Sequence, residues 1–115
     1  MGGALVLTAA AWGCTILAFT AGARAVGLEP SVGQAALLAA GTVLATAIPS
    51  APGYVGTFEL AAVTIAGSVG IVAEPALAFA VLVHATTLAL TSLAGASVLV
   101  LGGRGAAATP EVGLE

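Results

Sequence analysis

The stretch that decides the fold is PSAPGYVGTFE, residues 49–59. Two prolines and two glycines fall within its first eight residues, a content that the interior of a helix does not accommodate. Apolar runs flank it on both sides, over residues 32–48 and over residues 59–73. Irregular backbone at membrane depth persists only where protein buries it or where it lines a water-filled cavity. Residues 49–59 are therefore interpreted as a break between two short apolar helices.

The composition indicates whether water or lipid surrounds the chain. Of the 115 residues, 60% are apolar and 6% are charged, whereas an average soluble domain is about 25% charged. Disordered chains are poor in apolar residues, so disorder is excluded as well. The chain has no basic patch, which argues against a nucleic-acid partner. The composition therefore predicts an integral membrane protein.

Two further apolar runs, residues 4–23 and 76–101, are long enough to cross a bilayer. A signal peptide is the rival interpretation of the first run, but no basic residue precedes Arg24. The predicted fold class is all-α: a polytopic transmembrane helix bundle with two full spans and a pair of short helices broken by Pro and Gly. The sequence leaves open whether the short pair is a re-entrant hairpin, a pair of broken helices, or two tilted spans joined by an interfacial loop.

Several residues predict where helices begin. Ser31 can cap the second apolar run, and Thr57 is the expected N-cap of the third. Glu59 would then lie near the positive end of that helix dipole. Pro75 suits the first position of the last helix. Cys14 is expected to be a small buried apolar residue rather than a metal ligand.

Glu59 and His84 are the leading candidates for function. An ionised carboxylate inside a bilayer is costly and usually faces a cavity or a partner, although Glu59 can equally lie at an interface and cap a helix. His84 shares one stripe of the last helix with Thr87 and Thr91, which either faces a cavity or packs on a neighbouring helix. A Glu59–His84 pair could relay protons or hold a headgroup, but nothing in the sequence shows that the two meet.

The break supplies the remaining candidates. Tyr54 can contact a ligand or anchor the break at headgroup level, and Thr57 with the helix start could donate to a phosphate, since the chain offers no buried basic residue for one. Pro49, Pro52, Gly53 and Gly56 are the structural elements of the break. No catalytic residue, metal ligand set or cofactor is predicted, and a Ser-His-Asp triad is excluded because the chain contains no Asp.

The motif from Ile48 to Glu59 resembles the signature of a known family, the transmembrane region of lysylphosphatidylglycerol synthases and related flippase-like integral membrane proteins. A weaker resemblance continues from Ala76 to His84. The resemblance implies an all-helical protein of a bacterial-type plasma (inner) membrane, in which some members are thought to move a lipid or lipid-linked headgroup between leaflets. It also implies that a set of break residues would line or shape the translocation site: Pro49, Pro52, Gly53, Tyr54, Gly56 and Glu59.

The resemblance covers only the C-terminal part of the family's pattern. Residues 1–104 are therefore expected to be the C-terminal part of a flippase-like transmembrane domain, residues 105–115 a disordered polar tail, and Met1 an internal or misassigned start. The soluble aminoacyl-transferring domain has no counterpart in these residues, so the resemblance gives lysyl transfer no support. Expected partners are membrane lipids and either the remaining helices of a longer homologue or further copies of the chain. Two other functions stay open: an intramembrane enzyme or enzyme accessory, and a non-catalytic scaffold or truncated fragment.

Overall fold

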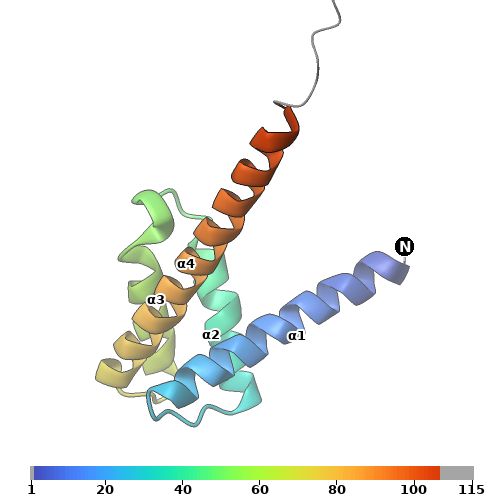
Figure 1. Cartoon of the computed structure of the whole chain (residues 1–115). Coiled ribbons are helices and arrows are strands. Elements are labelled where there is room, and N and C mark those ends of the chain that lie inside the picture. The colour runs from blue at the N-terminus through green and yellow to red at the C-terminus, as the bar shows by residue number, and fades with distance from the viewer. Residues whose placement is uncertain (1, 107–115) are drawn as a thin grey trace, which may run out of the picture. The chain divides into compact units, whose positions relative to one another are not determined.

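The computed structural model describes residues 2–106, with side chains for residues 2–102. Within this range it contains no strand, which confirms the all-α class. The elements in chain order are α1 (Gly2–Ala25), α2 (Val32–Ala45), the 3₁₀ turn η1 (Pro52–Tyr54), α3 (Thr57–Ser68) and α4 (Ala73–Ala106) (Figure 1). The chain divides into two units after Ala85, and each is described by itself. The first two residues of the predicted tail belong to α4, and residues 107–115 lie outside the described residues.

The start of α2 agrees with the sequence. Ser31 Oγ accepts a hydrogen bond from the Gln34 backbone N–H at 3.3 Å. In return, Gln34 Oε1 accepts from the Ser31 N–H at 2.8 Å. This reciprocal pair is a capping box, in which two amides that have no partner within the helix are both satisfied. The predicted N-cap at Ser31 is confirmed.

Two other predicted helix starts are wrong by one or two residues. The N-cap of α3 is Gly56 rather than Thr57, which is the first helical residue. Gly56 has φ 88°, a left-handed conformation that glycine adopts without steric cost. Helix α4 begins at Ala73, so Pro75 is its third residue. Pro75 is still within the first turn, where a missing N–H breaks no helical hydrogen bond.

Small residues bring the helices of the first unit together. α2 packs against both α1 and α3, and the buried core contains ten residues, of which six are alanines. The core residues are Phe19, Ala23, Leu38, Ala39, Phe58, Ala62, Ala66, Ala76, Phe79 and Ala80. Alanine stripes allow backbones to approach closely, which is how membrane helices associate when burial from water no longer drives them together.

Glycines mark two close approaches between helices. A Cβ built on Gly41 of α2 would overlap the side chain of Ile65 on α3, and one built on Gly22 of α1 would overlap Val83 of α4. Gly22 and the buried Phe19 therefore lie on the face of α1 that packs, whereas Trp12 is 41% exposed. Cys14 is exposed, so the prediction that it is buried is wrong, because it lies off the face that packs.

Large apolar side chains cover the outside of the described helices. Leu5, Leu17, Leu44 and Leu60 are each about 70% exposed. In the second unit, every described side chain from Thr86 to Gly102 is exposed. Such a surface suits lipid rather than water. The α1 helix and the Ala73–Gly102 part of α4 are both long and apolar enough to cross a membrane, whereas α2 and α3 are shorter, as the sequence predicts.

Candidate functional site

The break between α2 and α3 is built from residues with unusual backbone angles. Gly53 has φ 71°, Tyr54 has φ 57° and Gly56 has φ 88°. Tyr54 donates its backbone N–H to the Ala51 carbonyl at 2.9 Å, which closes the η1 turn. A left-handed tyrosine costs about 1–2 kcal/mol, so the turn holds Tyr54 in a conformation that it would not choose on its own. Pro49, Pro52 and the glycines thus form a defined turn, as the sequence predicts.

The break also lines an open pocket of about 380 Å³. Its lining comes from the end of α2 and from the break itself: Thr46, Ala47, Pro49, Ser50, Ala51, Pro52, Gly53 and Tyr54. None of these side chains carries a charge, and Tyr54 is 41% exposed. The hydroxyl groups of Thr46, Ser50 and Tyr54 are the polar side-chain groups at this pocket. The pocket therefore suits a neutral, polar or amphipathic group.

Glu59 lies where the break meets α3. Its Oε2 accepts a hydrogen bond from the Gly56 backbone N–H at 2.7 Å. The carboxylate therefore satisfies one of the amides that the helix start leaves without a partner, and its negative charge is favourable at the positive end of the helix dipole. The predicted position of Glu59 at the helix start is confirmed, although the residue that it caps is Gly56.

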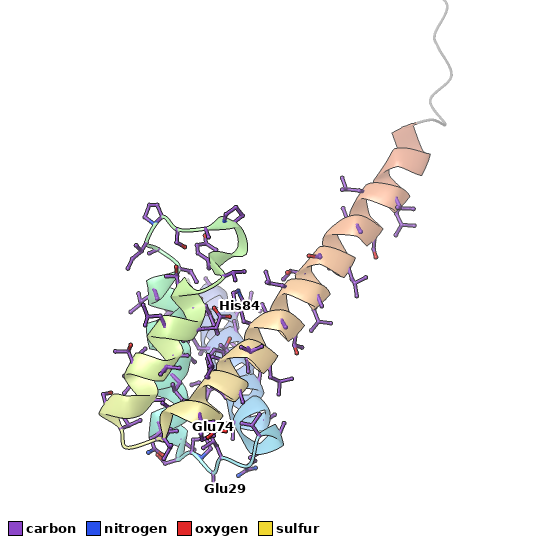
Figure 2. All side chains as sticks on the ribbon, turned by 90° about the vertical axis from the view of Figure 1, so that its left-hand side faces the viewer. Glu29, Glu74 and His84 are labelled. Carbon is purple, nitrogen blue, oxygen red and sulfur yellow. The ribbon has the colours of Figure 1, made fainter. Side chains whose placement is uncertain are left out.

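The second oxygen of the same carboxylate reaches another helix. Glu59 Oε1 lies 2.6 Å from Nδ1 of His84 on α4. The side chains are 17% exposed for Glu59 and 8% exposed for His84, so the pair is shielded on most sides. Figure 2 shows His84 beside the start of α3, away from Glu29 and Glu74 at the other end of the first unit. The structure therefore joins the two leading candidates in one short hydrogen bond.

Aromatic rings support the histidine. The His84 ring stacks on Phe58, with 4.5 Å between ring centroids. Phe58 contacts Phe19 at 6.4 Å, and Phe19 contacts Phe79 edge-on at 5.5 Å. All three phenylalanines of the chain thus form one ring cluster with its single histidine. Phe58 and Phe79 were not predicted to support the site. Their only signal in the sequence is four-residue spacing, with Phe58 preceding Ala62 and Phe79 preceding Val83.

The threonine candidates lie on α3 and α4. Thr91 Oγ1 donates to the Thr87 carbonyl of its own helix at 2.8 Å, and the side chains of both are exposed on α4. Thr57 is half-buried at the first position of α3. Tyr54 lines the break pocket instead of the pair.

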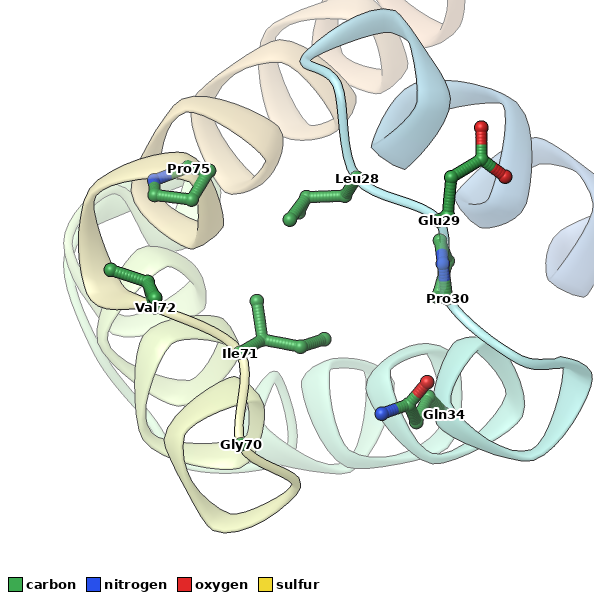
Figure 3. Close-up of a pocket in the computed structure, with 8 residues that line it drawn as sticks. All are labelled: Leu28, Glu29, Pro30, Gln34, Gly70, Ile71, Val72 and Pro75. Atoms are coloured by element: carbon green, nitrogen blue, oxygen red, sulfur yellow. The ribbon is translucent and has the colours of Figure 1, made fainter.

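A second polar link, which was not predicted from the sequence, lies in the hairpin that α2, the break and α3 form, at the end opposite to the break. Gln34 Nε2 donates to the Val69 carbonyl at the end of α3, at 3.2 Å. Gln34 therefore joins the α1–α2 loop to the α3–α4 loop. Figure 3 shows it at the edge of a pocket of about 240 Å³ that these two loops form. The sequence offered one signal, a glutamine at the third position of a capped helix.

Among the described residues, no three His, Cys, Asp or Glu side chains gather in a way that could hold a metal ion. The acidic and histidine side chains near the break are the two of the Glu59–His84 pair. The chemistry that these residues offer is the binding and release of a proton and the donation or acceptance of hydrogen bonds.

Residues 1–95 match the family model described as the lysylphosphatidylglycerol synthase TM region. The match includes α1, α2, the break, α3 and most of α4, and so contains every residue of the candidate site. No curated protein matches the chain, and no solved structure does.

Proposed function

Because the chain belongs to the family of lysylphosphatidylglycerol synthase transmembrane regions, we propose that it helps to move a lipid headgroup or a lipid-linked headgroup from one leaflet to the other. The family and the two long apolar helices make it an integral membrane protein. We place it in a plasma (inner) membrane. In this proposal the break and the Glu59–His84 pair form the passage, and further helices from a longer protein or from other copies complete its wall.

The lengths of α2 and α3 support a passage that lies within the membrane. α2 has 14 residues and α3 has 12, so at ~1.5 Å per residue they extend about 21 and 18 Å, against a hydrocarbon core of about 30 Å. The loops at Ser31 and Val69 lie at one end of this hairpin, where Gln34 joins them. With that end at one membrane surface, the hairpin is re-entrant and the break ends within the hydrocarbon region.

The single observation that carries the proposal is the shielded 2.6 Å contact between Glu59 and His84 beside the break. His84 is eleven residues beyond Ala73 in α4, or about 16 Å along the helix axis. In the re-entrant arrangement this is close to the bilayer midplane. Paired ionisable groups at that depth are costly and mark substrate or ion pathways in membrane proteins.

The test is a leaflet-selective assay in vesicles. The full chain is reconstituted with a fluorescent phosphatidylglycerol analogue, and dithionite is added to quench the outer leaflet only. Wild-type protein is expected to expose the inner-leaflet lipid over time, and Glu59→Gln to stop this exposure while the protein still inserts. Glu74→Gln is the matched control, because Glu74 is exposed in the first turn of α4. Equal exposure with wild type and Glu59→Gln would count against the proposal and favour a scaffold.

A second function, an accessory to an intramembrane enzyme, is favoured by the same pair, because a carboxylate hydrogen-bonded to an imidazole is a general acid–base arrangement. The two functions differ in their product. An intramembrane enzyme, or an accessory reconstituted with its enzyme, leaves a chemically altered lipid, whereas translocation leaves the lipid unchanged in the other leaflet. Mass spectrometry of the vesicle lipids after the assay distinguishes them.

A further inference from the structure

The Glu59 carboxylate ties two parts of the site together. One oxygen holds the Gly56 N–H at the end of the break, and the other holds His84 Nδ1 on α4. Whatever changes the charge of this carboxylate therefore acts on both hydrogen bonds at once. A charged acceptor forms hydrogen bonds about twice as strong as a neutral one.

The number of protons on the pair sets that charge. With one proton between Oε1 and Nδ1, the pair consists of a carboxylate and a neutral imidazole and carries one negative charge. With a second proton it is neutral overall. A net charge is costly in apolar surroundings and cheap where water reaches it. Proton uptake is thus favoured when the pair is dry, and proton release when the site is hydrated.

Other ionisable groups lie away from the pair. Helix α2 contains none, and Glu59 is the only one in α3. On α1, the Arg24 guanidinium is 3.3 Å from the exposed Glu29 carboxylate, and Cys14 is exposed. On α4, Glu74 is in the first turn, and in the break Tyr54 faces its own pocket. Among the described side chains, the charge of the pair therefore depends on its own protons.

We propose that Glu59 and His84 form a proton-binding site that controls the break and couples proton movement to headgroup passage. A hydronium ion on the side to which the pair opens gives up a proton to the His84 ring, which forms a new N–H bond and leaves water. The imidazolium then compensates the charge of Glu59, which accepts the Gly56 N–H more weakly, and the break loosens. Release of the same proton to water on the other side restores the neutral imidazole and the tight break. The coupling rests on the proposed translocation, whereas the proton site itself does not.

The first experiment measures the break without any lipid transport. A nitroxide is attached at Ser50→Cys in a Cys14→Ala background of the full chain, reconstituted in phosphatidylglycerol–phosphatidylethanolamine vesicles. Its mobility and its accessibility to a water-soluble relaxation agent are followed by electron paramagnetic resonance between pH 5 and 8. Both are expected to rise as the pH falls. Glu59→Gln, which keeps an acceptor oxygen but carries no charge for the imidazolium to compensate, is expected to lose this dependence.

Controls separate a proton site from a general effect of pH. Glu74→Gln should keep the wild-type pH profile, and a nitroxide at Ser68→Cys, at the far end of α3, should show none. His84→Gln should also flatten the profile, because this variant lacks the imidazole that takes up the second proton. A wild-type profile in Glu59→Gln, or a flat profile in the wild type, would overturn the inference.

The second experiment adds a pH gradient across the vesicles of the dithionite assay. The rate of lipid exposure is expected to increase when the gradient is imposed, and Glu59→Gln is expected to lose this increase. A pH-dependent nitroxide signal with no lipid exposure in any vesicle would retain the proton site and refute the translocation. If the rate of lipid exposure does not depend on the gradient and the nitroxide signal does not depend on pH, translocation would be retained and the proton site refuted.

Discussion

Glu59 Oε1 and His84 Nδ1 lie 2.6 Å apart, although 25 positions separate the two residues in the chain. The contact crosses from the start of α3 to a residue about three turns into α4 and is supported by the stacked ring of Phe58. Removing one partner of a shielded, charge-assisted hydrogen bond is costly, because the other partner is then buried without a hydrogen bond. The pair should therefore be detectable in stability as well as in function.

A double-mutant cycle measures that coupling. We expect Glu59→Ala and His84→Ala each to destabilise the protein, and the double variant to lose less than their sum by about 1–3 kcal/mol. The measurement is the free energy of unfolding in mixed detergent micelles. The control cycle uses Arg24→Ala and Glu29→Ala, whose side chains are 62% and 78% exposed; there the coupling should stay below about 1 kcal/mol. Equal coupling in both cycles would contradict the shielded pair.

The close approach of α2 and α3 predicts a steric effect at Gly41. Gly41→Val places two methyl groups against Ile65, and we expect a loss of about 1–3 kcal/mol in unfolding free energy from overpacking. Gly13→Val is the matched control, because a Cβ there meets nothing within 4 Å. Thermal unfolding of the two variants in the same detergent checks the difference. A Gly13→Val variant as unstable as Gly41→Val would show that helix propensity, not packing, governs both.

Gln34 is expected to matter for the end of the hairpin. Gln34→Leu removes the acceptor for the Ser31 N–H and the donor to the Val69 carbonyl, so we expect a loss of about 1–2 kcal/mol. Gln34→Glu keeps the acceptor and loses only the donor, and should fall between wild type and Gln34→Leu. Hydrogen exchange at the last turn of α3 reports on the donor. Unchanged exchange in both variants would rule out the link between the loops.

Labelling from each side of the membrane distinguishes the arrangements that the sequence leaves open. In the Cys14→Ala background, we expect Glu29→Cys and Ser68→Cys to react with a membrane-impermeant maleimide from the same side. Ser50→Cys should react much more slowly from either side, because the hairpin is shorter than the hydrocarbon core. Fast reaction of Ser50→Cys from the opposite side would instead indicate two tilted spans with an ordinary external linker, and the proposed passage would then be wrong.

Local features of the sequence predicted much of the fold. The break follows from prolines and glycines that cannot continue a helix, and the start of α2 follows from Ser31, whose hydroxyl accepts a backbone N–H. The errors at Thr57 and Pro75 are one or two residues. A helix start depends on which backbone amides find acceptors, and Gly56 can take a left-handed φ that moves the cap of α3 back by one residue.

The sequence by itself determined that the chain belongs in a membrane, that its helices number two long and two short, and where the break falls, because hydropathy and backbone preference act over neighbouring residues. The tertiary structure alone decided that Glu59 meets His84, that Phe19, Phe58 and Phe79 form one ring cluster, and that Gln34 reaches Val69. These contacts depend on how far each helix is rotated and how closely it approaches its neighbour. Small residues such as Gly41 set that approach, and no pattern along the chain reports it.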